Sequence, residues 1–198
     1  FPVMDKDQER EFLEVYSKAL VSLPFDLKVL LEAVADADLE HEVRELAAAA
    51  VVHIIAPKDG NVDRPLRHAE DVVLLRLALR KIATEGGEGA DAFRSRFEEN
   101  YSRLDAELAT FEAAFGNEAI TWLDTKWPAL SKVVYVRKKI PQFVDDEEMG
   151  TFLYDEGLRF GTEYPLTEKS LAGRVKQGQP IVDHLLRKRE QDRKKIQT

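Results

Sequence analysis

The chain has 198 residues, no cysteine and a formal charge of -8, from 29 Lys/Arg and 37 Asp/Glu. The lack of cysteine excludes disulfides, thiolate nucleophiles and cysteine-ligated metal centres, and the net negative charge disfavours nucleic acid as a partner. With 44% hydrophobic residues and no apolar run of the about 20 residues that span a bilayer, the composition predicts a soluble, cytoplasmic, globular protein.

Apolar residues recur at helical spacing along nearly the whole chain, which predicts an all-α fold, a single bundle of about eight helices around an αα-hairpin. The first helix is expected from about Lys6 to Val21. Ser22 should then cap a second helix that carries Pro24 in its first turn. A third helix is expected from Asp38 to Ala56, because the following residue, Pro57, disfavours helical geometry before it.

Two further helices are expected in the middle of the chain. One should begin near Pro65 and end at Gly86-Gly87, and its central sequence VVLLRLAL predicts the most buried helix of the bundle. The other should span residues 90–115. We assign its aromatic and leucine residues to the core. They are Phe93, Phe97, Tyr101, Leu104, Leu108, Phe111 and Phe115.

Beyond Pro128 the pattern is less regular. The stretch ALSKVVYVRKKI is compatible with helix or strand, and we predict a helix that Pro141 interrupts. A further helix is expected within VDDEEMGTFLYDEGLRFGTEY, and a last one from Pro180, whose buried residues should at most be Ile181, Val182, Leu185 and Leu186. The predicted organisation is a helical domain over 1–178, with a hairpin within 39–86, followed by a basic C-terminal helix or tail over 179–198.

The segment PKDGNVDRPLRHAEDVVLL, residues 57–75, joins the two most apolar helices. Its simplest role is a structural corner. Glu70 and Asp71 should occupy early turns of a helix, where the helix dipole favours anions, and Arg67 precedes Asp71 by four residues, a spacing that permits an ion pair. This corner is also the candidate site, whether structural or functional. Its residues are Asp59, Asp63, Arg67, His68, Glu70 and Asp71.

The same region, about residues 47–82, resembles the core of the YkvA-like family. Pro57, Asp59, Val62-Asp63 and the pair Glu70-Asp71 fill the positions of the family pattern. Two features depart from it, because the Ile-Pro-Asp of the family is Asn61-Val62-Asp63 here and the glycine before the acidic pair is absent. The resemblance implies a helical hairpin whose corner aspartates are held in place, and it implies no reaction.

A metal site is an alternative interpretation of the corner. Asp59, Asp63, His68 and Asp71 offer oxygen and nitrogen ligands that zinc or manganese accepts, which would suit a metal-dependent hydrolase-like enzyme. Against this alternative, the chain has no paired-histidine metal motif, and it has no nucleophile elbow or phosphate-binding loop. We therefore assign no catalytic residue, no metal and no cofactor.

Basic residues gather at the end of the chain. Residues 174–198 contain eight Lys/Arg and three Asp/Glu, a local charge of +5, and the preceding residues carry -13. The simplest interpretation is a solvated terminal helix, and the alternatives are docking to an acidic protein or to an anionic membrane. We predict a non-enzymatic interaction or regulatory module. The candidate partner-binding residues are Arg187, Lys188, Arg189, Arg193, Lys194 and Lys195.

Overall fold

The computed structural model describes residues 3–58 and 60–197, and 78% of the residues are helical, which confirms the all-α prediction. Among the described residues, no helix is both long enough and apolar enough to cross a lipid bilayer. The elements in chain order are α1 Lys6–Ala35, α2 His41–Ile55, α3 Arg64–Arg67, α4 Ala69–Glu85, η1 Gly87–Gly89, α5 Ala90–Arg96, α6 Glu98–Phe115, α7 Asn117–Asp124, α8 Trp127–Leu130, β1 Val134–Tyr135, β2 Lys138–Lys139, α9 Ile140–Asp145, α10 Glu147–Glu163, α11 Glu168–Leu171 and α12 Gln179–Gln197.

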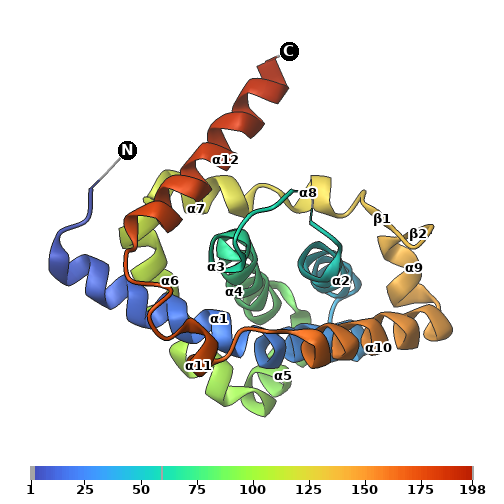
Figure 1. Cartoon of the computed structure of the whole chain (residues 1–198). Helices are drawn as coiled ribbons and strands as arrows, with labels where there is room; N and C mark the ends of the chain where they lie inside the picture. Colours follow the sequence, from blue (N-terminus) through green and yellow to red (C-terminus); the bar gives the residue numbers. More distant parts are fainter. Residues whose placement is uncertain (1–2, 59, 198) are drawn as a thin grey trace.

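Helices α2 and α4 form the centre of the bundle, and the other elements surround them (Figure 1). They contact one another, and both contact α1, which also packs along α10. Every residue from Ala69 to Leu79 of α4 is buried, so the prediction that this helix is the most buried is confirmed. The buried residues include Glu70, Asp71 and Arg76, which therefore need partners inside the protein.

Residues 6–35 form one continuous helix, whereas the sequence predicted two helices that meet at Ser22. Pro24 lies inside α1 and has no N–H to donate to the Leu20 carbonyl four residues earlier. The hydroxyl of Tyr164, just beyond α10, donates to that carbonyl instead. A tertiary contact thus satisfies the group that the proline leaves free, and the helix continues through it.

Two other predicted helices are each divided. The fourth is α3 and α4, with His68 between them, and the fifth is α5 and α6, with Phe97 at φ -114° and ψ 39° between them. Phe97 and Tyr101 are only half-buried, so their assignment to the core is corrected. The assignment is confirmed for Phe93, Leu104, Leu108, Phe111 and Phe115.

The helix predicted within ALSKVVYVRKKI is wrong. Strands β1 and β2 pair in antiparallel fashion, with Val134 opposite Lys139, around a two-residue turn. Val136 and Arg137 form the turn with φ of 48° and 64°, and such positive values are unfavourable for a β-branched valine. The valines of this segment favour extended backbone over helix, which explains the strands.

The last helix, α12, begins at Gln179 and confirms the prediction of a helix near Pro180. Its buried side chains are Ile181, Val182, Leu185 and Leu186, and they join the same hydrophobic core as α1 and α4. The helix contacts α3, α4, α6 and α7, and its far end projects from the bundle (Figure 1).

Candidate functional site

Glu70 and Asp71 lie in the first turn of α4 and expose only 2% and 1% of their surface. Buried carboxylates require compensating charges. The compensating side chains come from the end of α2, from the loop after it, from the residues just before α4 and α8, and from α12. We call the two carboxylates and these side chains together the corner cluster. Its members are His53, Lys58, His68, Glu70, Asp71, Lys126 and Lys188.

Asp71 is held by three cationic or hydrogen-bonding groups. Its Oδ1 lies 3.2 Å from Lys58 Nζ and 3.3 Å from His53 Nε2. Its Oδ2 lies 2.8 Å from His68 Nδ1. Burial alone would raise the pKa of Asp71, but the charge of Lys58 and the hydrogen bond from His68 lower it below its ordinary value. Asp71 is therefore ionised at neutral pH.

Glu70 is paired with two lysines from distant segments. Lys126 Nζ lies 2.8 Å from Oε1, and Lys188 Nζ lies 3.0 Å from Oε2. Burial alone would raise the pKa of Glu70, but a hydrogen bond from His53 and the two lysine charges lower it well below its ordinary value. Burial would lower the pKa of Lys126, yet Glu70 raises it, so both members of this pair stay charged.

The remaining corner residues do not converge on these groups. Asp63 is exposed and pairs with Arg174 at 2.9 Å. Arg67 donates to the Val62 carbonyl at 2.9 Å, in place of the ion pair with Asp71 that the spacing permitted. Asp59 lies outside the described residues. The described members of the alternative metal set are thus separated, with Asp63 at the surface and the other two bonded to each other.

Sequence reasoning did not place Lys126 and Lys188 beside Glu70, since they lie 56 and 118 positions from it, and it predicted Lys188 only as a partner-binding residue. It also missed a second buried network on α4, where Arg76 Nη2 lies 3.2 Å from Asp26 and 3.1 Å from Glu107. Burial raises the pKa of Asp26 despite that arginine. The only signal for this network was a charged residue inside VVLLRLAL, which requires a partner without identifying it.

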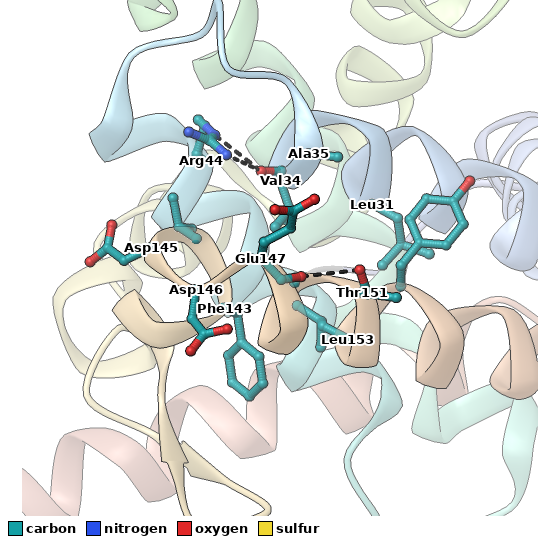
Figure 2. A pocket seen from close by; sticks show the side chains of 13 residues that line it. Leu31, Val34, Ala35, Arg44, Phe143, Asp145, Asp146, Glu147, Thr151 and Leu153 are labelled. Atoms are coloured by element: carbon teal, nitrogen blue, oxygen red, sulfur yellow. Dashed lines mark hydrogen bonds between the residues drawn. The ribbon is translucent and has the colours of Figure 1, made fainter.

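A pocket of about 460 Å³ lies where the end of α1, α2, α9 and the start of α10 meet (Figure 2). Arg44 borders it and donates through Nε and Nη2 to the Val34 carbonyl, at 3.0 and 2.8 Å, which closes the end of α1. The other polar residues that line this pocket are Asp145, Asp146, Glu147, Thr151 and Tyr154.

Beside this pocket, His41, Glu45 and Asp145 place ligand atoms within 4.8 Å of one another, a spacing that could hold a metal ion. In the structure these groups pair among themselves, because His41 Nδ1 lies 3.1 Å from Glu45 and Nε2 lies 2.5 Å from Asp145. The hydrogen bond to Asp145 raises the pKa of His41. Protonated, His41 satisfies both carboxylates without a metal.

The basic residues of α12 divide into two groups. Lys188 pairs with Glu70 and Arg189 pairs with Glu118 at 3.0 Å, so the first part of the basic stretch packs back on the bundle. Arg187 is exposed, and Arg193 pairs with Glu190 on the same helix. Lys194 and Lys195 are exposed at the projecting end.

Two truncations of α12 should distinguish the effects of these two groups of basic residues on stability. Removal of residues 193–198 is expected to leave the melting temperature nearly unchanged. Removal of 187–198 should lower the free energy of unfolding by about 1–3 kcal/mol, because Glu70 then loses one of its two lysines. Thermal and urea unfolding of both truncated proteins measure the difference. Equal stability of the two would contradict a structural role for Lys188.

Comparisons with known proteins add no functional assignment to this geometry. No protein-family model matches the chain, and no curated protein or solved structure matches it. The resemblance of residues 47–82 to the YkvA-like family therefore remains an expectation from the sequence.

Proposed function

We propose that this protein is a non-enzymatic interaction module that binds the surface of an anionic lipid membrane through the hairpin at residues 132–139. The observation that carries the proposal is a group of exposed valines surrounded by cations. Val133, Val134 and Val136 expose 41%, 57% and 57% of their surface. They are interspersed with Lys132, Arg137, Lys138 and Lys139.

The charge of the hairpin contrasts with that of the whole chain. Residues 131–140 contain four cations and no acidic residue, in a protein with a net charge of -8. Within the described part of the chain, none of the four cations has a carboxylate partner. The nearby Glu156 accepts from Tyr135 at 3.3 Å and pairs with Arg159 at 2.6 Å. The basic residues of the hairpin are therefore available to an external anion.

The shape of this surface favours a membrane over an acidic protein. A stable protein interface buries roughly 800 Å² on each partner, which is more than a hairpin with two residues per strand readily supplies. Insertion at a lipid interface needs only a small apolar tip with cations around it. The lysine stems can extend along the valines while their ammonium groups reach the headgroups.

The other candidate functions are less well supported. The corner cluster is buried and its charges neutralise one another, so it serves stability better than catalysis. In the basic stretch of α12, residues 187–195, Lys188 and Arg189 form ion pairs with carboxylates of the bundle. The hairpin combines exposed apolar surface with cations that have no such internal role.

Vesicle sedimentation tests the proposal. The protein should bind phosphatidylcholine vesicles that contain about 30% phosphatidylserine, and it should not bind pure phosphatidylcholine. The double variant Lys132→Ser/Arg137→Ser should bind roughly 30-fold more weakly, since each surface cation contributes about 1 kcal/mol. The variant Val134→Ser/Val136→Ser should also bind more weakly, because it loses the apolar tip.

The matched control is Arg10→Ser/Lys18→Ser, which removes two exposed cations from α1. It should retain most of the vesicle binding. The proposal fails if this control loses as much vesicle binding as the hairpin variant. It also fails if the wild-type protein binds polyaspartate but does not bind anionic vesicles, a result that would indicate an acidic protein partner.

A further inference from the structure

A small pocket of about 180 Å³ lies beside the corner cluster, between the end of α2, α3 and the end of α10. It is smaller than the roughly 300–1,000 Å³ of pockets that hold drug-sized ligands, so it suits a ligand of a few heavy atoms. Four of the six titratable side chains that line it are basic. The titratable side chains that line it are Lys58, Arg64, Arg67, His68, Glu163 and Tyr164.

Two of these side chains have buried polar atoms that find no hydrogen-bond partner among the residues that the structure describes. His68 exposes only 2% of its surface, and its Nδ1 is bonded to Asp71, while no described residue is bonded to Nε2 on the other side of the ring. Arg67 Nε likewise has no partner among the described residues. Buried polar atoms in native proteins nearly always have partners, because leaving one without a partner is unfavourable. A bound ligand would supply the hydrogen-bond partners that these atoms lack.

The hydrogen bond between His68 and Asp71 limits which ligands can bind at Nε2. An ionised Asp71 can only accept, so Nδ1 of His68 donates this hydrogen bond, and in the neutral imidazole Nε2 then presents a lone pair. The ligand must then combine negative charge, for the surrounding cations, with a hydroxyl that donates to Nε2. A phosphate group that keeps one proton has both properties. Sulfate and carboxylates lack the hydroxyl proton at neutral pH.

We infer that this pocket binds a phosphate group, with Lys58, Arg64 and Arg67 around its oxygens and a P–OH donating to His68 Nε2. Arg64 is exposed at the pocket, and within the described residues it has no carboxylate partner. Guanidinium groups match the geometry of phosphate oxygens. The ring of Phe160, which also lines the pocket, packs against His68 at a centroid distance of 6.4 Å.

Calorimetry and NMR on the full chain test the inference, with inorganic phosphate as the probe. Phosphate should bind and should shift the ¹⁵N signal of His68 Nε2. Sulfate at the same concentration should bind at least several-fold more weakly, because it cannot donate to that nitrogen. The substitution Arg64→Gln should weaken phosphate binding roughly tenfold through the loss of a charge-assisted hydrogen bond.

Arg10→Gln is the matched control, since that arginine is exposed on α1 and far along the chain from the pocket. It should bind phosphate as the wild type does. Because Arg64 is exposed, its substitution should leave the fold intact, and an unchanged melting temperature verifies this. Absence of phosphate binding, equal binding of sulfate, or equal losses in the two variants would each overturn the inference. None of these results depends on vesicle binding by the hairpin.

Discussion

Replacement of Glu70 with glutamine is expected to lower the free energy of unfolding by about 3–5 kcal/mol. The substitution keeps the size of the side chain but removes the charge that compensates Lys126 and Lys188. Loss of one partner of a buried ion pair leaves the opposite charge uncompensated, which costs more than the pair itself contributes. Urea unfolding at neutral pH measures the change.

Glu118→Gln is the matched control for this experiment. Glu118 also pairs with a cation of α12, Arg189 at 3.0 Å, but its side chain is 82% exposed. Exposed ion pairs contribute at most about 1 kcal/mol, so this variant should be nearly as stable as the wild type. Similar, small losses in both variants would show that solvent reaches Glu70 and that the corner cluster is not a buried network.

The same two variants test how the free energy of unfolding depends on pH. The pKa of Glu70 is well below its ordinary value of about 4.5, so the unfolded chain binds this proton more readily than the folded protein does. The stabilisation from Glu70 is therefore complete above the ordinary pKa and is lost as the pH falls toward the folded one. Unfolding curves between about pH 6 and pH 3 should show a smaller acid-induced loss for Glu70→Gln than for Glu118→Gln.

Phe111→Ala should destabilise the protein by about 3–5 kcal/mol, the usual effect of removing a fully buried aromatic ring. The ring lies 6.2 Å from Phe12 and 6.4 Å from Tyr16 in edge-on contacts, so it joins α6 to α1. The guanidinium of Arg76 also lies 5.7 Å from its centre. Thermal or urea unfolding measures the loss.

The comparison variant is Phe97→Ala, from the same predicted seam. Phe97 is only half-buried, at the break between α5 and α6, and its truncation should cost clearly less than that of Phe111. If Phe97→Ala were the more damaging substitution, the ring of Phe97 would belong to the core as fully as that of Phe111, and its half-buried position would be contradicted.

Most helices were predictable because helical periodicity is a local property. The apolar stretch of α4 indicated its burial, and the isoleucine, valine and leucine residues after Pro180 indicated how far α12 would pack. The hairpin at 132–139 was not predicted, although its valines favoured strands. The composition of this stretch was compatible with helix or strand, and the short two-residue strands leave little alternation to decide between them.

The sequence by itself determined the all-α class, the apolar faces of the helices and the presence of charges within α4, because each depends on neighbouring residues. Only the tertiary structure decided how those charges are balanced. Lys126 and Lys188 reach Glu70 from far along the chain, and Tyr164 satisfies the carbonyl that Pro24 leaves free in α1. No local spacing records such contacts, since they arise only when distant helices pack together and bury polar groups that must then find partners.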